Sequence, residues 1–521
     1  MNVGQKGLRL LAVLLLVLAS LALVAAAKPA GSHVGELPLG KPGLGEKQTT
    51  QQVAPGVTYT RIERGEQSEK DFYTVDVTFK ADRSEAESVA TRLRSDGYEP
   101  RIEEVSERAP DDPESGPLGY LVRTGSFDTQ AGADALRAEL AARGYTGLRT
   151  VYTGEDGNET TGPWVVHVLA IDPDLYNGTL APELATEIVP GRETLTAISA
   201  RTDSLAAING GYFVIEERDG TPGDLAGTSV LDGELVSEAV DGRTDLILPR
   251  GSGEGADVAA ISDSLSATVS DGATREVDGR NREPGLIRGC GGDGGDQPTE
   301  RPKHDFTCTD ESELIQFTPI FGMATEPGEG AEAILDPSGR VVAFRESRGG
   351  PIPPDGSVLS GTGEAAGWLR DHAKPGAKVR VKVNLSAEDG RLPQRTGIVN
   401  GGPRLLSGGS PDITAYAEGF HWPENPEFYY RFGVRRNPRT LAGTTPGGSL
   451  LLVAVDGRQP GYSVGASFEE SAEIMAALGA EEAVNLDGGG STAMTLDERL
   501  VNRPSDATGE RPIGDAVVLL P

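Results

Sequence analysis

The sequence has few of the residues and motifs on which several common enzyme chemistries depend. Its 521 residues include two cysteines and five histidines, and no HExxH, paired CxxC or GxxxxGKS/T pattern occurs. These absences remove support for a zinc protease, a zinc finger and a P-loop nucleotide triphosphatase. A G-x-S-x-G match at residues 461–465 lacks the later histidine that a hydrolase nucleophile elbow needs, because the last histidine is His421. Carboxylate chemistry is what the sequence supplies in quantity.

Positive charge is also scarce. Lys and Arg number 48 against 79 Asp and Glu, which gives a formal net charge of −31 at pH 7. Nucleic-acid backbones and anionic lipid surfaces repel such a chain, so nucleic-acid binding is disfavoured. Aromatic residues make up 5% of the chain, whereas 70 glycines and 35 prolines indicate many turns. We expect an α+β fold with two folded units and many loops.

One long apolar run, Leu10 to Ala27, follows Lys6 and Arg9 near the start of the chain. This pattern predicts a secretory signal peptide at residues 1–27 and a secreted or cell-envelope protein. The run is just long enough to cross a bilayer, so an uncleaved membrane anchor is the alternative. Residues 28–70 show no periodicity and are predicted to form a linker.

The two cysteines, Cys290 and Cys308, lie in a Gly/Asp/Pro-rich segment, residues 276–312, which is predicted to be an insertion. In an exported protein such a pair more often forms a disulfide than a metal site. Asp293 and Asp296 could hold calcium, but they lack the full carboxylate ladder of a known calcium loop. We therefore predict a disulfide-closed acidic loop without a metal, and the sequence shows no cofactor requirement.

An internal repeat appears when the sequence is shifted by 47 positions. Tyr73 then aligns with Tyr120, Val75 with Val122, Val89 with Leu136, Leu93 with Leu140, Gly97 with Gly144 and Tyr98 with Tyr145. Each copy has the pattern strand, amphipathic helix, Gly-Tyr and strand. Ser84 and Glu87 predict a capping box at the first helix. Two βαβ units predict a small ferredoxin-like module.

Residues 71–153 resemble the SPOR (sporulation-related repeat) family. The resemblance rests on the (F/Y)xVxxGSF pattern at Tyr120–Phe127, which is degenerate in the first copy. It implies binding to the glycan strands of peptidoglycan. A small structural domain without a binding function is the alternative.

Three segments of residues 164–521 share one design, in which a short apolar strand leads to an Asn or Asp and then to glycines. They are AINGGYF at 207–213, IVNGGPR at 398–404 and VNLDGGGS at 484–491. Glycines let backbone N–H groups approach a ligand, so polar strand ends beside them suit a sugar or phosphate pocket. The alternative is three hairpin turns. The candidate binding residues are Asn209, Gly210, Gly211, Asn400, Gly401, Arg404, Gly488, Gly489, Gly490 and Ser491.

A fourth segment gathers cations before the apolar strand at residues 450–455. Its Arg435, Arg436 and Arg439, beside Thr440, could bind a phosphate or carboxylate, although an ion-pair network is an equal alternative for the first two. Glycosidic hydrolysis calls on carboxylates, and each of Asp456 and Asp487 follows an apolar strand. Arg439 could neutralise a phosphate leaving group. Ser467 and Glu470 form a predicted capping box, which gives Glu470 a structural role.

The segments around RNPRT (436–440) and NLDGGGS (485–491) resemble the phosphodiester glycosidase family over about residues 164–521. Members remove a sugar, N-acetylglucosamine in one lysosomal member, from its linkage to phosphate. The resemblance implies a mixed α+β catalytic domain. It also implies a reaction centre lined by Asp487, Arg439 and Asn209, with Asp456, Asn400 and Gly488–Gly490 around it. The insertion at 276–312 departs from the family pattern, which affects the substrate more than the chemistry.

Together these patterns predict a secreted hydrolase that cleaves a sugar from a phosphodiester polymer or glycoconjugate and is held on peptidoglycan by the repeat module. The first alternative is a wall-glycan binding protein without catalysis. The second is an enzyme acting on a phosphate-free polysaccharide.

Overall fold

The computed structural model describes residues 35–240, 242–249, 255–290, 301–388, 390, 392 and 396–521. The predicted signal peptide, Asp293 and Asp296 lie outside these residues. Within the described ranges no helix is both long and apolar enough to cross a membrane. The chain divides into two units, Met1–Glu36 and Leu37–Pro521, and the description below concerns the second. It is rich in strands and has few helices.

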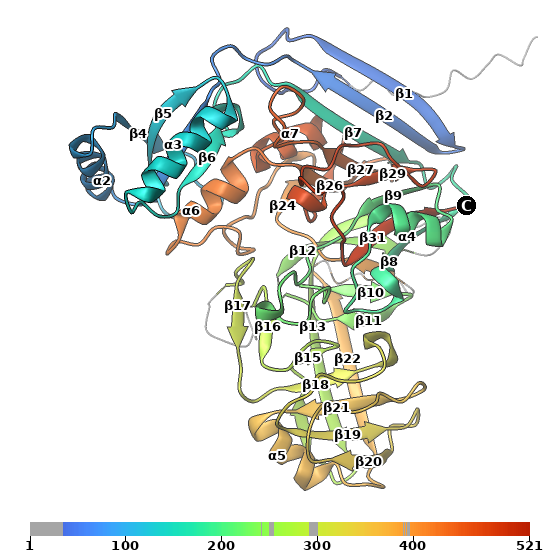
Figure 1. Cartoon of the computed structure of the whole chain (residues 1–521). Coiled ribbons are helices and arrows are strands. Elements are labelled where there is room, and N and C mark those ends of the chain that lie inside the picture. The colour runs from blue at the N-terminus through green and yellow to red at the C-terminus, as the bar shows by residue number, and fades with distance from the viewer. Residues whose placement is uncertain are drawn as a thin grey trace, which may run out of the picture. The chain divides into compact units, whose positions relative to one another are not determined.

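The repeat segment forms a four-stranded antiparallel sheet with two helices (Figure 1). Its elements are β3 (Tyr73–Lys80), α2 (Arg83–Ser95), β4 (Pro100–Val105), β5 (Gly119–Phe127), α3 (Gln130–Ala142) and β6 (Arg149–Tyr152), and the strand order is β4-β5-β3-β6. Both helices pack on the sheet around Val75, Val122, Leu93 and Leu140. The helices begin 47 residues apart, the same offset as the sequence repeat.

The predicted capping box at Ser84 and Glu87 is wrong. Helix α2 begins at Arg83, with the extended residue Asp82 at its N-cap, and no side chain caps it. Ser84 therefore lies inside the first turn, where its hydroxyl cannot act as the cap. The capping box of Ser467 and Glu470 is confirmed at helix α7 (Phe468–Ala477).

The linker predicted at residues 28–70 is wrong for residues 46–64, which form a strand hairpin. Strand β2 pairs with β7 along its whole length and buries Val57 and Ile62. Strand β1 carries mostly polar side chains, which hid it in the sequence. The hairpin extends an eight-stranded sheet with the order β1-β2-β7-β27-β26-β28-β24-β25 (Figure 1). Its strands are β1 (Glu46–Ala54), β2 (Val57–Arg64), β7 (Trp164–Ile171), β24 (Arg404–Ser407), β25 (Ser410–Pro411), β26 (Arg439–Thr444), β27 (Leu450–Val455) and β28 (Glu482–Asn485).

Four further sheets complete the large domain. The five-stranded sheet contains β30 (Arg499–Leu500), β29 (Met494–Leu496), β9 (Ala206–Asn209), β31 (Asp515–Leu520) and β8 (Thr179–Leu184). The seven-stranded sheet contains β11 (Glu234–Ser237), β10 (Ser229–Leu231), β23 (Thr396–Val399), β12 (Arg243–Pro249), β13 (Asp257–Val269), β14 (Thr274–Glu276) and β22 (Val379–Ala387). A second five-stranded sheet contains β15 (Gly279–Arg280), β18 (Leu314–Phe317), β21 (Ser357–Gly361), β19 (Ala331–Leu335) and β20 (Val341–Arg345). Strands β16 (Leu286–Arg288) and β17 (Thr307–Thr309) form a separate pair.

The helices of this domain are short. The α-helices are α4 (Leu195–Thr202), α5 (Gly363–His372), α6 (Pro426–Tyr429) and α7, and a π-helical turn, η5 (Tyr430–Val434), continues α6. Single 3₁₀ turns are η1 (Thr153–Glu155), η2 (Ala185–Glu187), η3 (Glu217–Asp219), η4 (Pro319–Phe321) and η6 (Gly489–Ser491).

One apolar core aligns the three strands that precede the glycine-rich segments. Ile208 of β9, Val399 of β23 and Val484 of β28 are all fully buried in this core. Because each of these strands ends just beyond its core residue, the polar residues that follow are held close together. This packing places the predicted strand-end residues at one site.

A buried ion network joins the repeat module to the large domain. Arg123 of β5 donates to Asp76 at 2.7 Å and to both oxygens of Asp156, at 2.6 and 2.9 Å. It also donates to the Tyr430 hydroxyl at 3.0 Å, and Arg435 donates to Asp156 at 2.6 Å. Burial alone would raise the pKa of Asp156, but the two guanidinium groups outweigh it and hold that pKa below its ordinary value. The module is therefore fixed to the large domain through paired buried charges.

Replacing Arg123 with methionine is expected to lower the free energy of unfolding by about 3 kcal/mol, because it leaves buried carboxylates without their partner. Urea denaturation of the purified protein measures this. The matched control is Arg137→Met on α3, whose pair with Asp134 is exposed and contributes well under about 1 kcal/mol. Equal effects of the two substitutions would contradict the network's structural role.

Candidate active site

A cavity of about 300 Å³ opens where the glycine-rich strand ends meet. Of the residues that the structure describes, those lining it include six arginines but two carboxylates. The lining residues are Tyr212, Phe213, Ile215, Ala226, Arg243, Arg288, Gly289, His304, Asp305, Arg431, Phe432, Asn437, Arg439, Arg458, Asp487, Gly488, Gly489, Gly490 and Arg511. In a chain of net charge −31, this concentration of guanidinium groups favours an anionic ligand.

Asp487 lies in the loop between β28 and η6 and lines the cavity, as the sequence predicted. Burial raises the pKa of its carboxyl to about 7, and the negative charges of Asp305 and Asp515 act in the same direction, whereas Arg511 opposes them. Both protonation states are therefore populated near neutral pH. A carboxyl with this property inside a cationic cavity is suited to proton transfer.

Asn209 and Asn400 lie beneath the cavity instead of lining it. The Asn209 side chain donates to the backbone carbonyl of Asp487 at 2.7 Å and accepts from the Thr440 hydroxyl at 2.7 Å. The Asn400 side chain accepts from the backbone N–H of Tyr212 at 2.8 Å and donates to its carbonyl at 3.3 Å. Both asparagines, with Thr440, therefore position residues that line the cavity.

The glycines that follow these asparagines also serve the scaffold. Gly211 donates its N–H to the Asp515 carboxylate at 2.8 Å, and Gly401 donates to Asp245 at 3.0 Å. The Gly210 N–H donates to the Asp515 carbonyl at 2.9 Å. A Cβ at Gly211 would lie 2.5 Å from the Asn400 amide, so close packing explains this glycine. Of the predicted glycines, the three that line the cavity are Gly488, Gly489 and Gly490.

Asp456, Arg404 and Ser491, which the sequence assigned to the site, do not line the cavity. The Asp456 carboxylate accepts hydrogen bonds from Tyr462 at 2.8 Å and from Asn502 at 3.1 Å, and it contacts His167 at 3.1 Å. These partners hold it in the protein interior and explain why its position after a strand was misleading. Arg404 forms an ion pair with Glu388. Ser491 is buried, at 1% exposure.

Arg439 lines the cavity, as predicted, and its orientation is fixed. Its guanidinium donates to the carbonyls of Ala466 at 2.9 Å and Phe432 at 2.5 Å and lies 4.4 Å from the centre of the Phe468 ring. Backbone carbonyls orient the charge but do not neutralise it. Burial lowers the pKa of Arg439 to about 10, so it stays cationic at neutral pH.

The flanking arginines have a different role. Arg435 pairs with Glu155 and Asp156, and Arg436 makes a bidentate pair with Glu470. The ion-pair network, one of the two sequence interpretations, describes both residues.

Arg243 is the clearest cavity residue that the sequence analysis missed. It begins β12, it is 1% exposed, and its three guanidinium nitrogens have no hydrogen-bond partner among the described residues. Burial lowers its pKa. The nearby Asp245 offers little compensation, because burial raises the pKa of that carboxyl to about 8. Leaving a guanidinium buried and unpaired is costly, so its position in the cavity indicates an anion ligand.

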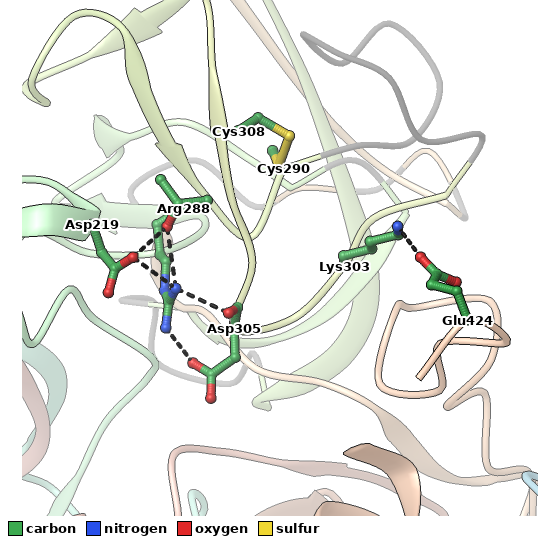
Figure 2. Close-up of a disulfide and its surroundings, with 8 residues drawn as sticks. Asp219, Arg288, Cys290, Lys303, Asp305, Cys308 and Glu424 are labelled. Atoms are coloured by element: carbon green, nitrogen blue, oxygen red, sulfur yellow. Dashed lines mark hydrogen bonds and ion pairs between the residues drawn. A yellow bond between two sulfur atoms is a disulfide. The ribbon is translucent and has the colours of Figure 1, made fainter. Parts of the chain in front are cut away.

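The segment predicted as a surface insertion forms one wall of the cavity. Cys290 and Cys308 form the predicted disulfide, with Cα atoms 5.9 Å apart. Figure 2 shows Arg288, beside this disulfide, lying between Asp219 and Asp305, with Arg288–Asp305 at 2.6 Å. Four cavity residues, Arg288, Gly289, His304 and Asp305, come from this segment. Its irregular composition gave no sign that it reaches the site.

Little in the sequence indicated that three other basic residues of the cavity, Arg458, Arg511 and His304, belong to the site. Arg458 follows the strand end at residues 455–457 and donates to the Asn437 side chain at 2.9 Å. Arg511 pairs with Asp506 at 2.9 Å. His304 packs its ring 4.2 Å from that of Tyr212, and burial holds its pKa well below the ordinary value, so it is neutral.

Residues 329–520 match the phosphodiester glycosidase family, a span that includes Asp487 and Arg439 but not Arg243 or Asp305. No curated protein matches the sequence. The crystal structure of a presumed exported protein from Burkholderia pseudomallei K96243 is 36% identical, covers 93% of this chain and 98% of its own, and has a TM-score of 0.85.

Two more distant structures also match. A hypothetical protein from Synechocystis shares the fold at 19% identity and a TM-score of 0.54, over 91% of this chain and 76% of its own. The catalytic domain of zebrafish N-acetylglucosamine-1-phosphodiester α-N-acetylglucosaminidase, auto-inhibited by its pro-peptide, is 14% identical over 86% of this chain and 88% of its own. Its TM-score of 0.33 is too low to support an argument.

The raised pKa of Asp487 predicts a pH-dependent stability difference. The folded protein keeps a proton on Asp487 that the unfolded chain releases above about pH 4, so this carboxyl costs stability increasingly as the pH rises from about 4 to about 7. Asp487→Asn is therefore expected to be more stable than the wild type by about 1–3 kcal/mol at pH 8, and by little at pH 4. Urea denaturation at the two pH values measures the difference. A gain that does not change with pH would refute the assignment.

Proposed function

We propose that the chain, whose residues 329–520 match the phosphodiester glycosidase family, hydrolyses the bond between the anomeric carbon of a sugar and the phosphate of a phosphodiester. The observation that carries this proposal is that Asp487 lines the same cavity as two guanidinium groups, those of Arg243 and Arg439, that no carboxylate among the described residues neutralises through an ion pair.

In the proposed reaction, Arg243, Arg439 and Arg458 bind the phosphate. Water adds to the anomeric carbon, and ionised Asp487 accepts the proton of that water. The bond between carbon and oxygen breaks with its electron pair on the phosphate oxygen. The products are the free sugar and a phosphomonoester, whose additional negative charge the arginines stabilise. This leaving group is stable as an anion, so the reaction needs less help from a general acid.

Asp305 is the second carboxylate of the cavity. Its pair with Arg288 keeps it in place, and its negative charge stabilises the positive charge that develops on the sugar ring. Tyr212, Phe213 and Phe432 provide apolar ring surface in the same cavity, which supports a sugar such as N-acetylglucosamine.

Incubation of the exported chain with an N-acetylglucosamine-1-phosphodiester is expected to release free sugar and phosphomonoester, detected by mass spectrometry. Asp487→Asn is expected to lower kcat by about 10²–10⁴-fold, and kcat/KM of the wild type should rise with pH through about 7 as Asp487 ionises. Asp497→Asn, the same change at an exposed turn, is the control.

Arg243→Met is expected to lower kcat/KM by about 100-fold by removing a phosphate contact. Full activity of the Asp487 variant would overturn its role. Saturable binding without turnover would favour the non-enzymatic alternative, and equal turnover of phosphate-free glycosides would favour a polysaccharide hydrolase.

For the repeat module, we propose a SPOR-like, ferredoxin-like domain that binds the glycan strands of peptidoglycan at the cell envelope. The strand order β4-β5-β3-β6 supports the ferredoxin-like arrangement, as does the 47-residue offset between the starts of α2 and α3, which equals the offset of the sequence repeat. The signal-like N-terminal sequence and the exported character ascribed to the Burkholderia protein support secretion. Attachment to the wall would raise the local concentration of a wall-polymer substrate.

The packing of the module restricts where a glycan can bind. The sheet face without helices is covered, because Tyr430 stacks on Phe79 with ring centres 5.5 Å apart and bonds to Arg123. At the ends of the two helices, the exposed Arg143 lies over the half-buried Tyr98 ring at 5.1 Å, and the exposed Arg92 lies over the ring of Tyr145, which is buried, at 4.2 Å. The two tyrosines are equivalent in the repeat, and we propose the accessible part of this helix-end cluster, Tyr98 with Arg92 and Arg143, as the glycan contact.

The exported chain is expected to sediment with purified peptidoglycan sacculi in a saturable manner. Replacing Tyr98 and Arg143 with alanine is expected to weaken sedimentation at least 5-fold. The control, Arg137→Ala in helix α3, is expected to leave sedimentation unchanged. If the protein stays in the supernatant at all sacculus concentrations, the peptidoglycan proposal is wrong, and the catalytic proposal is unaffected.

A further inference from the structure

A single segment, residues 430–439, lines the active-site cavity and also contacts the repeat module. It runs from the π-helical turn η5 to the first residue of β26. Its cavity-lining residues are Arg431, Phe432, Asn437 and Arg439. Single π-helical turns are rare in proteins and occur frequently at functional sites. The contacts of this segment with the module therefore bear on the geometry of the cavity.

Two other residues of the segment, Tyr430 and Arg435, anchor it to the repeat module and to Asp156, which follows the module in the chain. The Tyr430 hydroxyl accepts a hydrogen bond from Arg123 at 3.0 Å and donates one to Asp156 at 3.2 Å, and its ring stacks on Phe79. Arg435 donates to Asp156 at 2.6 Å. The Arg435 N–H also donates to the Tyr430 carbonyl at 2.8 Å, so the two anchor residues close the turn between them.

One cavity residue contacts the module directly. The guanidinium of Arg431 lies 3.8 Å from the carboxylate of Asp76 in strand β3, and it also pairs with Glu427 of helix α6. The cavity wall and the module therefore share an ion pair.

The segment also orients two of the cavity arginines proposed to bind the phosphate. Arg439 donates to the Phe432 carbonyl at 2.5 Å. Arg458 donates to the side-chain oxygen of Asn437 at 2.9 Å, and the side-chain nitrogen of Asn437 donates to the Arg435 carbonyl at 3.0 Å. The positions of both guanidinium groups therefore depend on where the anchored backbone lies.

The carboxyl of Asp487 depends on other contacts. Asn209 of β9 donates to its backbone carbonyl at 2.7 Å. The charges that act on its pKa, those of Asp305, Asp515 and Arg511, also lie outside residues 430–439. A shift of the segment is therefore expected to change phosphate binding more than the ionisation of Asp487.

The partners of the anchor residues lie outside the span that matches the phosphodiester glycosidase family. That span begins at residue 329, whereas Phe79, Arg123 and Asp156 precede it. The contacts that hold η5 in this chain thus come from residues beyond the matched domain.

We propose that the repeat module positions the phosphate-binding arginines of the active site, with Tyr430 and Asp156 as the positioning residues. The module is then part of the catalytic unit, because the backbone that contacts it also carries the groups that orient Arg439 and Arg458. This inference rests on the phosphate-binding role proposed above for these arginines.

Tyr430→Phe tests the positioning, because it removes one hydroxyl and keeps the ring that stacks on Phe79. In isothermal titration calorimetry of the purified protein with inorganic phosphate, the variant is expected to bind at least about 5-fold more weakly than the wild type, at unchanged stoichiometry. The matched control is Tyr176→Phe, which removes a hydroxyl that donates to the Leu520 carbonyl at 2.5 Å and lies outside the cavity lining. The control is expected to leave the affinity unchanged.

Asp156→Asn is the second variant, because it weakens both anchors at once. Arg123 keeps its bond to Asp76, and Arg435 keeps its bond to Glu155. Phosphate affinity is expected to fall at least about 10-fold. Thermal melting verifies that this variant is folded, and Tyr430→Phe decides the question if it is not.

Kinetics distinguish positioning from a merely structural role. With an N-acetylglucosamine-1-phosphodiester, Tyr430→Phe is expected to raise KM at least about 5-fold, while kcat/KM still rises with pH through about 7, as Asp487 sets it. A variant that is only partly unfolded would instead show a lower kcat and a lower binding stoichiometry, with KM and phosphate affinity unchanged. That result would overturn the proposal.

Binding and turnover together separate this inference from the proposed function. Wild-type phosphate affinity in both variants, with turnover of the diester by the wild type, would overturn the positioning and leave the glycosidase function intact. Weaker phosphate binding by the variants, with no turnover by the wild type, would support the positioning and contradict the function. A wild type that binds no phosphate would overturn the role of the arginines and this inference with it.

Discussion

The site depends on keeping positive charge uncompensated inside an acidic protein. Arg439 is oriented by backbone carbonyls and the Phe468 ring, neither of which carries a negative charge. Arg243 has no hydrogen-bond partner among the described residues, and the carboxyls near it are themselves buried, which raises their pKa values and weakens their ability to neutralise it. Burial thus acts in two ways, by making an anion the best available partner for the arginines and by keeping internal carboxylates from taking that place.

The polar residues at the strand ends have two different roles in the site. The buried strands of three sheets bring Asn209, Asn400 and Asp487 together, but only Asp487 faces the cavity. The side chains of the two asparagines form hydrogen bonds with the backbone of Asp487 and Tyr212. Such support from packed polar groups fixes a reacting carboxyl more firmly than a loop alone could.

Sequence patterns predicted the parts of this arrangement that are local in the chain. The glycine-rich strand end identified Asp487 and Gly488–Gly490, the pair of cysteines identified the disulfide, and the Ser467–Glu470 spacing identified a helix start. Arg243 and Asp305 were missed because nothing in their neighbours distinguishes a buried arginine or a cavity-facing aspartate from exposed ones. Strand β1 was missed because it carries mostly polar side chains and is fixed by pairing with β2. Asp456 was wrongly assigned to the site because the residues that hold it in the interior come from distant segments of the chain.

The disulfide between Cys290 and Cys308 closes the segment that supplies Arg288, His304 and Asp305 to the cavity. The two cysteines are 18 residues apart in the sequence, so the bond ties two separate stretches of backbone into one wall. Cysteines of the cytosol are normally kept reduced, whereas those of exported proteins are oxidised. The wall therefore acquires its covalent tie only in an oxidising compartment, so the final form of the cavity around Asp487 depends on the redox state of the protein's surroundings.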